Sequence, residues 1–567
     1  MRRTSLRGGT TKQSNLTRNS SGWIATSLRY ASLLAMTFAL LIVVLTSCVK
    51  HADPNEGLSI FKYNESAGIL TLDPIYAKDL PHIWACNQLY SSLVAFDKEM
   101  DVVPRVAKSW DISEDGTVYT FHLRGDVHYH QDESIPEGRV VKAEDVCYSF
   151  NRVVDKTLNS PGSWIFASVA HDDGHYAFQA IDDSTFQVTL SKPFPPFLGI
   201  LSMTYASIVP KEAVEYYGDD FRRHPVGTGP FHFQYWNEGV KLVFRRNPNY
   251  FELDEEGERL PYLDAVSISF LIDRQVAFLE FIKGKFDFMS GIDARYKDEL
   301  LTYDGELRKK YEDKIELITG PYLNTEYICF YVDPADTLGL ERARALRQAV
   351  NLCIDRDKML RYLRNGIGIP GTGGMIPVGL PGHRDSIGYD YDLKRAQRLV
   401  KDYRLEGYTL NLSTTAEYAD IGKFVQSQTE QIGLQCKMEV MPPATLKSMR
   451  SNGSLQFFRA SWVADYPDAE NYLSLFTTSN FSPDGPNYSH YSNPRFNRLY
   501  DKAMACTDED VREAYYAEMD SLMMLDAPVV VLFYDEVLRF VNKRVEGLGS
   551  NPTNLLDLRK VKITPNS

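Results

Sequence analysis

The stretch "PRVAKSWDISEDGTVYTFHLR", residues 104–124, contains the clearest fold signal of the chain. Its Asp115-Gly116 pair predicts a tight two-residue hairpin turn, because glycine supplies the positive φ that such a turn requires. On the far side of the turn, "YTFHLR" alternates apolar and polar residues, as a strand with one buried face does. A helix is expected next, over residues 142–155. Strands and helices that alternate in this way indicate a mixed α/β protein.

Segments farther along the chain continue this mixture. A turn and a strand are expected within 181–198, two strands around a turn within 226–251, and a near-continuous apolar strand at 527–541. The segment 342–360 has the apolar spacing of a single amphipathic helix. The residues expected on its core-facing side are Leu346, Val350, Cys353 and Leu360.

The size and composition describe a folded protein of several domains. A chain of 567 residues is too long for one hydrophobic core and predicts two to four domains. Without residues 1–47, which contain six basic and no acidic residues, the formal net charge changes from −13 to −19. An acidic surface disfavours nucleic acid as a partner, since phosphate binding requires basic side chains. It is better suited to cationic or zwitterionic ligands.

The N-terminus has the pattern of an export signal: a basic region, the apolar run 31–45, and then small residues. This apolar run is shorter than the roughly 20 residues that a membrane-spanning helix needs, although a single-span anchor remains the alternative. The segment "LTSC" that ends at Cys48 resembles the lipobox of bacterial lipoproteins. That resemblance implies a signal peptide over 1–47, an acylated Cys48 at the mature N-terminus, and a polar tether over 48–56.

The six remaining cysteines form no CxxC pair and have no zinc-site spacing. In an exported protein one disulfide could form, but buried, unpaired thiols are the favoured interpretation. These residues are Cys86, Cys147, Cys329, Cys353, Cys436 and Cys506.

Three patterns that could bind a metal or phosphate are weak. His171 and His175 have zinc-helix spacing, but the Asp-Gly between them predicts a turn that would separate them. His128 and His130 would share a strand face without an identifiable third ligand. The glycines of "VGTG" (226–229) lack the Gly-Lys-Ser/Thr of a phosphate loop. We therefore expect no metal and no cofactor.

Catalytic signatures are also weak. There is no GxSxG, and no cysteine lies in a known nucleophile motif. Asp465, Asp468 and Glu470 could form the paired carboxylates of a hydrolase, but an acidic chain offers many such trios. An exported hydrolase is kept as an alternative of a different class, and our main expectation is a protein that is not an enzyme.

Several motifs, in the same order along the chain, resemble the family 5 solute-binding proteins of ABC importers, which include oligopeptide and dipeptide receptors. The resemblance covers nearly the whole mature chain. Val106 and Phe231 differ from the residues that are usual in the family, and 127–146 is longer than the family's hairpin. The motifs are "LTLDP" (70–74), "PRVAKSWDISEDGTVYTFHLR" (104–124), "AEDVCYSF" (143–150), "PVGTGPF" (225–231), "NPNYF" (247–251), "KGKFDF" (283–288), "RQAVNLCIDRDKM" (347–359) and "WVADYPDAENYL" (462–473).

This resemblance implies a two-lobed periplasmic-binding-protein-like α/β fold with a small extra domain, closing over a ligand by a hinge between the lobes. It places the lobe boundaries as follows: lobe I at 57–80, 196–318 and 532–567, the inserted small domain at 81–195, and lobe III at 319–531.

The resemblance also proposes a site in "RASWVADYPDAENYL", residues 459–473. In oligopeptide-binding members, the aspartate at the Asp465 position pairs with the α-ammonium of the ligand, and the arginine at the Arg459 position can meet a carboxylate. Trp462 and Tyr466 would then line the cleft. The alternative is structural, with Trp462 in the core and Asp465 as a helix N-cap.

The function implied is a lipid-anchored receptor that captures peptides outside the cytoplasm and delivers them to an ABC permease complex. We expect a monomer at the cell envelope, anchored through Cys48 and facing the periplasm or the extracellular side. Relatives in the family also bind oligosaccharides, metal chelates or haem, so the resemblance leaves these ligands open.

Overall fold

The computed structural model describes residues 57–291, 296–332 and 337–564. The chain divides into two compact units, Met1–Leu58 and Ser59–Ser567. Only the last two residues of the first unit are described, so the predicted signal peptide and Cys48 lie outside the described residues. All that follows concerns the second unit.

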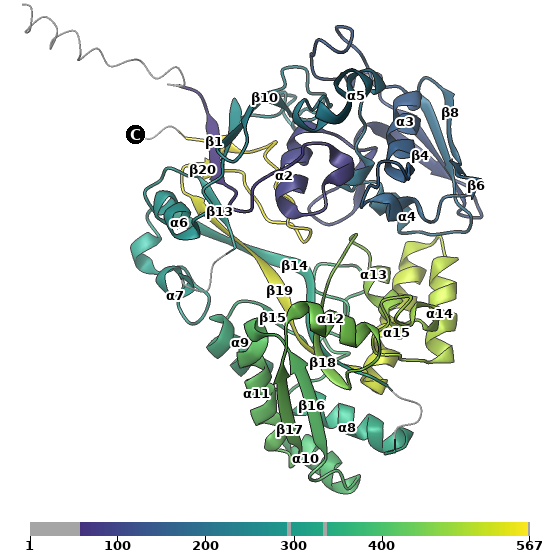
Figure 1. Ribbon diagram of the computed structural model, residues 1–567, viewed down its shortest axis with the longest axis vertical. Coiled ribbons are helices and arrows are strands. Elements are labelled where there is room, and N and C mark those ends of the chain that lie inside the picture. The colour runs from purple at the N-terminus through teal and green to yellow at the C-terminus, as the bar shows by residue number, and fades with distance from the viewer. Residues whose placement is uncertain (1–56, 292–295, 333–336, 565–567) are drawn as a thin grey trace, which may run out of the picture. The chain divides into compact units, whose positions relative to one another are not determined.

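The largest element is an eleven-stranded sheet that contains strands from both ends of the chain (Figure 1). Ten strands form one continuous path, and β15 (Ile369–Pro370) pairs separately with β19. In spatial order the ten are β10 (Phe231–Asn237), β11 (Lys241–Arg246), β12 (Ala265–Ser269), β1 (Ile60–Asn64), β13 (Phe288–Ser290), β19 (Val529–Asn542), β14 (Ile315–Phe330), β18 (Phe457–Val463), β16 (Thr409–Thr414) and β17 (Gln435–Val440).

Strand direction changes along this sheet. β1 is parallel to β12 and β13, and β16 is parallel to β17 and β18. Between these groups, β13, β19, β14 and β18 pair antiparallel. Parallel strands need crossover connections, which are usually helical, so two α/β regions are joined by a central antiparallel ribbon. The predicted α/β fold class is confirmed.

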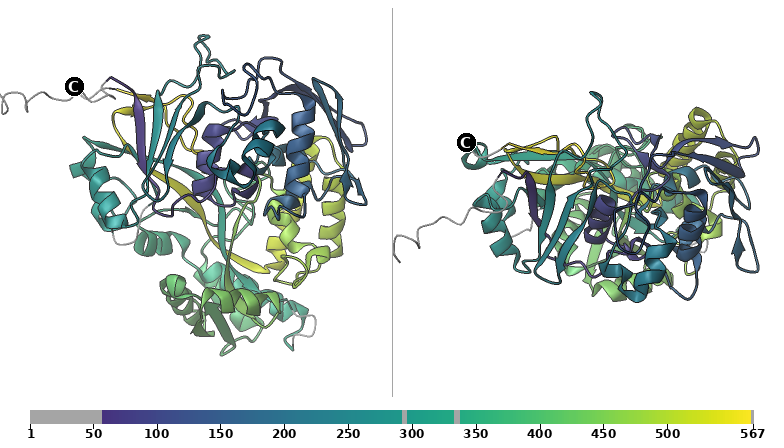
Figure 2. Two further views of the ribbon diagram at one scale, coloured as in Figure 1. Left: turned by 45° about the horizontal axis from the view of Figure 1, so that its top comes forward. Right: turned by 90° about the horizontal axis from the view of Figure 1, so that it is seen from above.

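The two long strands β14 and β19, teal and yellow in Figure 2, run side by side and pass from one hydrophobic core to another. The C-terminal half of β14, from Leu323, packs in a core with the first half of β19. At the other ends, Leu538 and Phe540 of β19 pack with Ile315 in a separate cluster. The pairing shifts register between Pro321 and Thr325. The lobe boundaries derived from the family resemblance stay predictions.

The helices have the following bounds. Helices before β14 are α2 (Leu80–Leu89), α3 (Ala143–Val154), α4 (Phe197–Ile200), α5 (Lys211–Tyr217), α6 (Arg274–Ile282) and α7 (Lys297–Leu300). Those between β14 and β19 are α8 (Leu340–Cys353), α9 (Arg356–Arg364), α10 (Leu393–Asp402), α11 (Ala419–Glu430), α12 (Pro443–Ser451), α13 (Glu470–Leu473), α14 (Pro494–Met504) and α15 (Glu509–Asp526).

The hairpin predicted at 104–124 is present, but its turn is wider than predicted. β4 (Ala107–Ile112) pairs with β5 (Val118–Leu123) in a four-stranded sheet completed by β9 (Thr185–Thr189) and β8 (Phe178–Asp182). Ser113 N donates to Val118 O at 3.0 Å, which leaves four residues in the loop. Gly116 has the expected positive φ of 68°. The Asp115 carboxylate accepts hydrogen bonds from the Ser113 hydroxyl and Thr117 N, and these bonds stabilise the longer loop.

The single helix predicted at 342–360 is wrong. The chain forms α8 and α9 with a break at Ile354 and Asp355. The Asp355 carboxylate accepts from Lys358 N at 3.0 Å and is the N-cap of α9. An aspartate favours a new helix start over continuation of the old one, because its side chain competes for backbone N–H groups. Leu360 is still buried, but on the second helix.

The glycines of "VGTG" (226–229) allow this loop to lie directly against the backbone of Leu89. A Cβ atom at Gly229 would lie 2.4 Å from the carbonyl carbon of Leu89, and one at Gly227 would lie 2.2 Å from Leu89 O. His130 supports the same loop through Nε2 to Gly229 O (3.0 Å), and Gly227 N donates to its Nδ1 (3.3 Å). Burial lowers the pKa of His130 to about 3, so this side chain is neutral.

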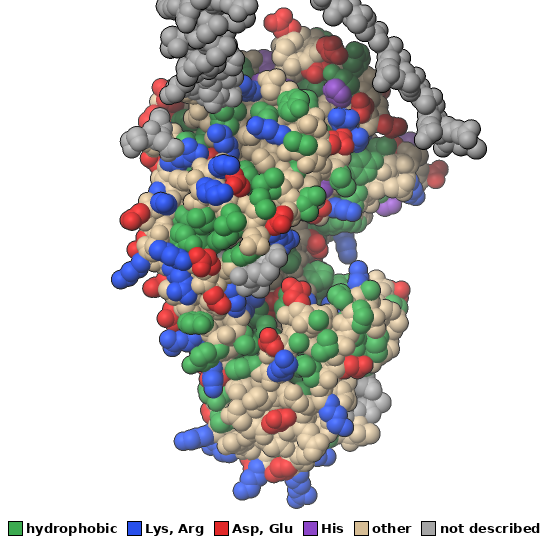
Figure 3. Space-filling view, turned by 60° about the vertical axis from the view of Figure 1, so that its left-hand side comes forward, with side chains coloured by type: hydrophobic (Ala, Val, Ile, Leu, Met, Phe, Trp, Pro, Cys, Tyr) green, Lys and Arg blue, Asp and Glu red, His purple; other side chains and the backbone are tan. Residues whose placement is uncertain are grey.

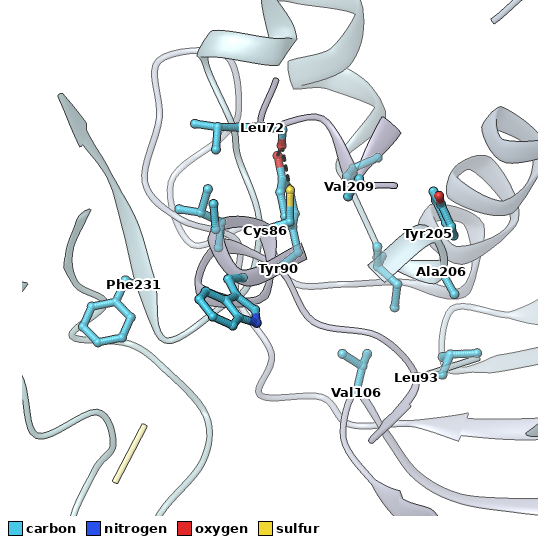
Figure 4. Close-up of a cluster of buried hydrophobic side chains, with 14 of the residues drawn as sticks. Leu72, Cys86, Tyr90, Leu93, Val106, Tyr205, Ala206, Val209 and Phe231 are labelled. Atoms are coloured by element: carbon cyan, nitrogen blue, oxygen red, sulfur yellow. Dashed lines mark hydrogen bonds between the residues drawn. The ribbon is translucent and has the colours of Figure 1, made fainter. Parts of the chain in front are cut away.

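Figure 4 shows part of the largest hydrophobic core. The Tyr90 hydroxyl and the Cys86 thiol both donate to Leu72 O, at 3.0 and 3.6 Å. Val106 and Phe231, where the chain departs from the family pattern, are both fully buried. The two departures therefore affect packing in this core.

The six described cysteines are all free, and four of them are buried, as the favoured interpretation expected. Among described helices, none combines the length and the apolar character needed to cross a membrane. On the face shown in Figure 3, basic and acidic side chains are interspersed rather than gathered into separate areas.

Candidate functional site

The segment proposed from sequence as the site spans the end of one strand and the loop after it. Arg459 and Trp462 lie on β18, and Asp465 and Tyr466 lie between β18 and α13. Since side chains alternate along a strand, residues three apart point to opposite faces. The structure therefore groups Trp462 with the loop residues and places Arg459 apart from them.

Arg459 has a partner within the protein. Its Nε and Nη2 atoms donate to the Glu326 carboxylate at 3.1 and 2.7 Å, and its guanidinium lies 3.6 Å from the centroid of the Tyr418 ring. Glu326, on the neighbouring β14, is 3% exposed. Burial raises the pKa of Glu326 although Arg459 opposes this, so the pair holds a charge that would otherwise be costly to bury.

The ion pair belongs to a longer polar network across the central strands. The Asn324 amide lies 3.5 Å from Glu326 Oε1 and donates to Asp535 Oδ2 at 3.1 Å. Asp535 in turn accepts from Arg364 Nη2 at 2.6 Å. Two arginines and two carboxylates thus compensate one another, with the amide between them.

Trp462 and Asp465 are joined through one amide. Asn471 Oδ1 accepts from Trp462 Nε1 at 2.7 Å and from the backbone N of Asp465 at 3.1 Å. The interpretation of Asp465 as a helix N-cap is wrong, because α13 begins at Glu470 and it is Asp468 Oδ1 that accepts from Glu470 N, at 2.8 Å. The side chain of Asp465 is thus not needed to start the helix.

The Asp465 carboxylate has no Lys or Arg ion-pair partner among the described residues. Burial raises its pKa, and a hydrogen bond from the Asn471 side chain opposes the rise. The residue as a whole is nevertheless exposed to solvent. Both observations hold if the carboxylate lies in a recess, surrounded by protein on several sides and open on one, where a cation could reach it.

The charge of Asp465 acts on Tyr205 together with the charge of Asp79, which comes from a distant part of the chain. Burial raises the pKa of Tyr205 to about 12, and the negative charges of Asp79 and Asp465 add to this effect. The charge of Asp79 also contributes to the raised pKa of Glu65, for which burial is the main cause. Tyr205 is therefore within reach of negative charges from two segments far apart in the chain, and such a field favours a cationic ligand.

The backbone of this acidic neighbourhood is fixed by His82. Leu70 N donates to His82 Nε2 at 3.1 Å, and His82 Nδ1 bonds to the Asp79 carboxylate. Nε2 must be the acceptor, so the proton lies on Nδ1. Leu70 itself is 76% exposed.

Tyr466 is held by a buried carboxylate and lies near two aromatic side chains, Trp164 and Phe194, from the first half of the chain. Its hydroxyl, and that of Tyr500, both donate to Glu470. The Tyr466 ring lies 6.2 Å from Trp164 and 6.4 Å from Phe194, measured between ring centroids. Burial raises the pKa of Glu470 to about 7, because no cation compensates it.

Tyr466 also lines a cavity of about 590 Å³. One wall comes from residues 96–119 and 193–199, and the other from residues 466–469 and 507–516. This volume lies within the usual range for small-molecule sites. Of the four residues predicted from sequence, only Tyr466 contributes to this lining, and the ligand roles of all four stay predictions.

The three carboxylates considered for a hydrolase have separate partners. Asp468 bonds to Glu470 N and lies near Arg512, while Glu470 accepts two tyrosine hydroxyls. Asp465 lies on the exposed loop. Paired catalytic carboxylates need to face one substrate bond from two sides, and these hydrogen bonds tie Asp468 and Glu470 to local structure instead.

The metal-site patterns are likewise accounted for. His171 and His175 lie in the short strands β6 (His171–Asp172) and β7 (His175–Tyr176), separated by the predicted Asp-Gly turn. His130 uses both ring nitrogens on backbone groups. Within the described ranges, no group of three or more His, Cys, Asp and Glu side chains could hold a metal ion.

Several residues of this region were not predicted from sequence. Glu326 gave a signal, since a lone carboxylate in the apolar strand "YLNTEYICF" needs a buried partner. Nothing local distinguishes Asn471, Tyr205 or Trp164 from ordinary polar and core residues. Their roles depend on contacts between segments far apart in the chain.

Comparison with known proteins identifies the family of the chain. Residues 101–484 match the family described as bacterial extracellular solute-binding proteins, family 5. The chain is 26% identical over 506 residues to the dipeptide-binding protein of Escherichia coli K12, covering 84% of this chain and 89% of that protein. It is 24% identical over 557 residues to heme-binding protein A of Haemophilus influenzae, covering 91% and 96%.

Among solved structures, the chain resembles the periplasmic binding protein DppA from Helicobacter pylori in complex with the peptide STSA. The TM-score is 0.66 and the sequence identity 26%, with 89% of this chain and 98% of that chain covered. The similarity extends over nearly the entire length of each relative, so it concerns the whole fold and not a single domain.

Proposed function

Because the chain belongs to the family 5 bacterial extracellular solute-binding proteins, as the sequence motifs predicted, we propose that it is the receptor of an ABC importer. It captures peptides outside the cytoplasm and delivers them to a membrane permease complex. The dipeptide-binding relative and the peptide-bound structure of DppA support peptides as the ligand class.

The observation that carries the peptide proposal is the uncompensated carboxylate of Asp465. It has no Lys or Arg partner among the described residues and a raised pKa, and its charge acts on Tyr205 together with that of Asp79. A desolvated carboxylate is stabilised by a charged hydrogen-bond donor. The α-ammonium of a peptide supplies that donor, and Trp462 and Tyr466 supply aromatic surfaces beside it.

Arg459 has a different role in this proposal. Its charge is already balanced by Glu326, so a ligand carboxylate would have to compete with a bidentate, buried partner. We assign Arg459 to the support of the strand that carries Trp462. The ligand carboxylate is then bound elsewhere or left in solvent.

The receptor is proposed to act without catalysis and as a monomer. One experiment separates it from the exported hydrolase: mass spectrometry of ligands carried through native purification, followed by incubation with added peptide. Intact peptides, both co-purified and returned after incubation, support the receptor. Cleaved peptides would contradict it, and co-purified haem or an oligosaccharide would replace peptide as the ligand class.

Closure of two lobes around the ligand is part of the proposal. β14 and β19 each contribute residues to two separate hydrophobic cores and so connect them. The register shift after Pro321 interrupts the pairing of the two strands. Such a ribbon can absorb a small rotation with few broken contacts. Small-angle scattering should give a smaller radius of gyration when a verified peptide saturates the protein, and an unchanged radius would argue against closure.

The mature chain is proposed to begin at acylated Cys48 and to be held at the cell envelope. This rests on the sequence pattern alone, since these residues lie outside the described ranges. Cys48→Ser should abolish lipidation and leave uncleaved precursor. A variant that matures and fractionates like the wild type would exclude the anchor.

A further inference from the structure

A second cavity, of about 1010 Å³, shares Phe96 with the Tyr466 cavity, and its other lining residues are different. We call it the basic cavity. Its walls come from the β2–β3 hairpin (β2 Val94–Phe96, β3 Val102–Pro104), from residues 124–138, from residues 248–260, and from the C-terminal segment at 559–560. The longer hairpin segment, one of the chain's departures from the family, thus supplies part of the wall.

Cationic side chains converge on this cavity from all four segments. Five cationic and four acidic side chains line it, although the chain as a whole is strongly acidic. Like charges brought together repel one another, so this convergence needs a stabilising counterpart. The cationic side chains are Arg105, Arg124, Arg259, Arg559 and Lys560.

Arg105 is the least satisfied of these side chains. It is 7% exposed, and its Nε atom has no hydrogen-bond partner among the described residues. The nearest carboxylate oxygen, Glu252 Oε1, lies 3.6 Å from that nitrogen, and Nη2 reaches the Tyr250 hydroxyl only at 3.5 Å. A guanidinium has five N–H donors, and a buried one with so few bonds is costly unless a ligand completes them.

Three of the acidic groups nearby are already paired with arginines. Glu252 and Asp557 both hold Arg559, through an ion pair and through Nη2 to Oδ2 at 2.7 Å. Burial alone would raise the pKa of each carboxyl, but Arg559 and Arg105 outweigh it and lower both. Asp126 is bound by Arg124 at 2.9 Å through two parallel bonds. Neither Lys560 nor Arg259 has a carboxylate partner among the described side chains.

The wall also has an apolar part. The Arg124 guanidinium lies 5.1 Å from the centroid of the Phe251 ring, and Phe96 and Leu260 line the same space. Leu253, which is 54% exposed, lies at its border. A ligand that matched this lining would have one anionic group and an apolar portion.

We propose that the basic cavity is a second binding site, separate from the peptide site, for an organic anion whose carboxylate or phosphate group meets Arg105. Arg105 supplies the planar fork that suits an oxyanion, and Lys560 adds a charge at the mouth. The apolar part of the ligand lies against Phe96 and Phe251. This inference does not depend on the peptide assignment.

Titration calorimetry of the purified protein at low ionic strength tests the proposal. The probes are octyl phosphate, octanoate, inorganic phosphate and octyltrimethylammonium. At least one of the two octyl anions should bind, and the comparison between them identifies the preferred oxyanion. Weaker binding of inorganic phosphate confirms the apolar contribution. The cationic probe should not bind.

Variants locate the site. Arg105→Gln should weaken binding of the octyl anion at least tenfold, and Lys560→Gln about threefold, since Lys560 is exposed and its loss leaves the fold intact. Lys401→Gln, at an exposed lysine of α10, is the matched control and should bind normally, as should Asp465→Asn. The proposal is overturned if neither octyl anion binds at millimolar concentration, if the cation binds equally, or if Lys560→Gln and Arg105→Gln both bind like the wild type.

Discussion

Arg459 and Asp465 lie six residues apart and carry opposite charges, but the fold treats them differently. Arg459 lies against β14, where Glu326 takes two of its hydrogen bonds. Asp465 lies in the loop after β18, where burial raises the pKa of its carboxyl and, among the described residues, a hydrogen bond from the Asn471 side chain opposes that rise. One charge is balanced inside the protein, and the other has no Lys or Arg partner among the described residues.

This contrast between Arg459 and Asp465 gives a rule for choosing which charged residue of a motif is the better candidate for ligand binding. A buried ion pair is satisfied in the absence of ligand and contributes to the folded state, because removing one member leaves an unpaired buried charge. A carboxylate with a raised pKa and no ion pair is a stronger candidate for a binding group. The basic cavity repeats this contrast, with Arg559 paired and Arg105 undersatisfied.

The largest effect is expected for the Glu326–Arg459 ion pair, and it concerns the stability of the protein. Glu326→Gln keeps the shape of the side chain and leaves Arg459 buried without a counter-charge, which should lower the free energy of unfolding by about 3–5 kcal/mol. Urea denaturation measures it. Glu406→Gln, at an exposed glutamate, should change stability by less than about 0.5 kcal/mol. The double variant Glu326→Leu/Arg459→Met should recover most of the loss. If Glu326→Gln were as stable as the control, the ion pair would not support the strand.

On the unpaired side, Asp465→Asn should weaken peptide binding and leave stability nearly unchanged. Truncating a buried charge pair between partners costs about 2–5 kcal/mol, or roughly 30-fold to several-thousand-fold in affinity. Calorimetry with a peptide and its N-acetylated analogue measures it: the wild type should discriminate strongly between them, and Asp465→Asn much less. Asp402→Asn, at an exposed aspartate, is the control. Equal binding of both peptides by the wild type would remove Asp465 as the ammonium partner.

A third prediction concerns Glu470, which supports Tyr466 and is buried without a cation. Its pKa is raised from 4.5 to about 7 by burial, so the folded protein binds this proton more tightly than the unfolded chain. Its contribution to the free energy of unfolding is greatest below pH 4.5 and falls by about 3 kcal/mol as the pH rises to 7. Glu470→Gln should lose that part of the slope in denaturation at several pH values. Asp520, also with a pKa of about 7, supplies the same slope in both proteins. Identical slopes would show that Glu470 does not titrate in this range.

The smallest effect is expected for Trp462→Phe. The substitution removes the hydrogen bond from Nε1 to Asn471, which also holds the backbone of Asp465. One such bond contributes about 1 kcal/mol, so peptide affinity should fall about fivefold. Trp236→Phe is the matched control, because Trp236 Nε1 has no hydrogen-bond partner among the described residues. A loss equal in both variants would indicate a general effect of removing an indole.

Local sequence was sufficient to predict secondary-structure elements that depend only on residues close together in the chain. The hairpin at Asp115-Gly116, the helix α3 and the apolar strand β19 all appear where alternation, periodicity and turn residues predicted them. The same rules gave the wrong turn length at Asp115 and missed the break at Asp355. In both cases an aspartate side chain accepts hydrogen bonds from nearby backbone N–H groups. Such bonds compete with regular secondary structure, and the spacing of apolar residues does not reveal them.

The sequence by itself determined the family, through ordered motifs, and the α/β class, through local pattern. It also identified 459–473 as the segment to inspect. Only the tertiary structure decided that Arg459 is paired with Glu326, that Asp465 is not a helix cap, and that arginines from four segments share one cavity. The physical reason is that periodicity and turn chemistry act between neighbours in sequence, whereas charge compensation and burial depend on distances in space between segments that the fold brings together.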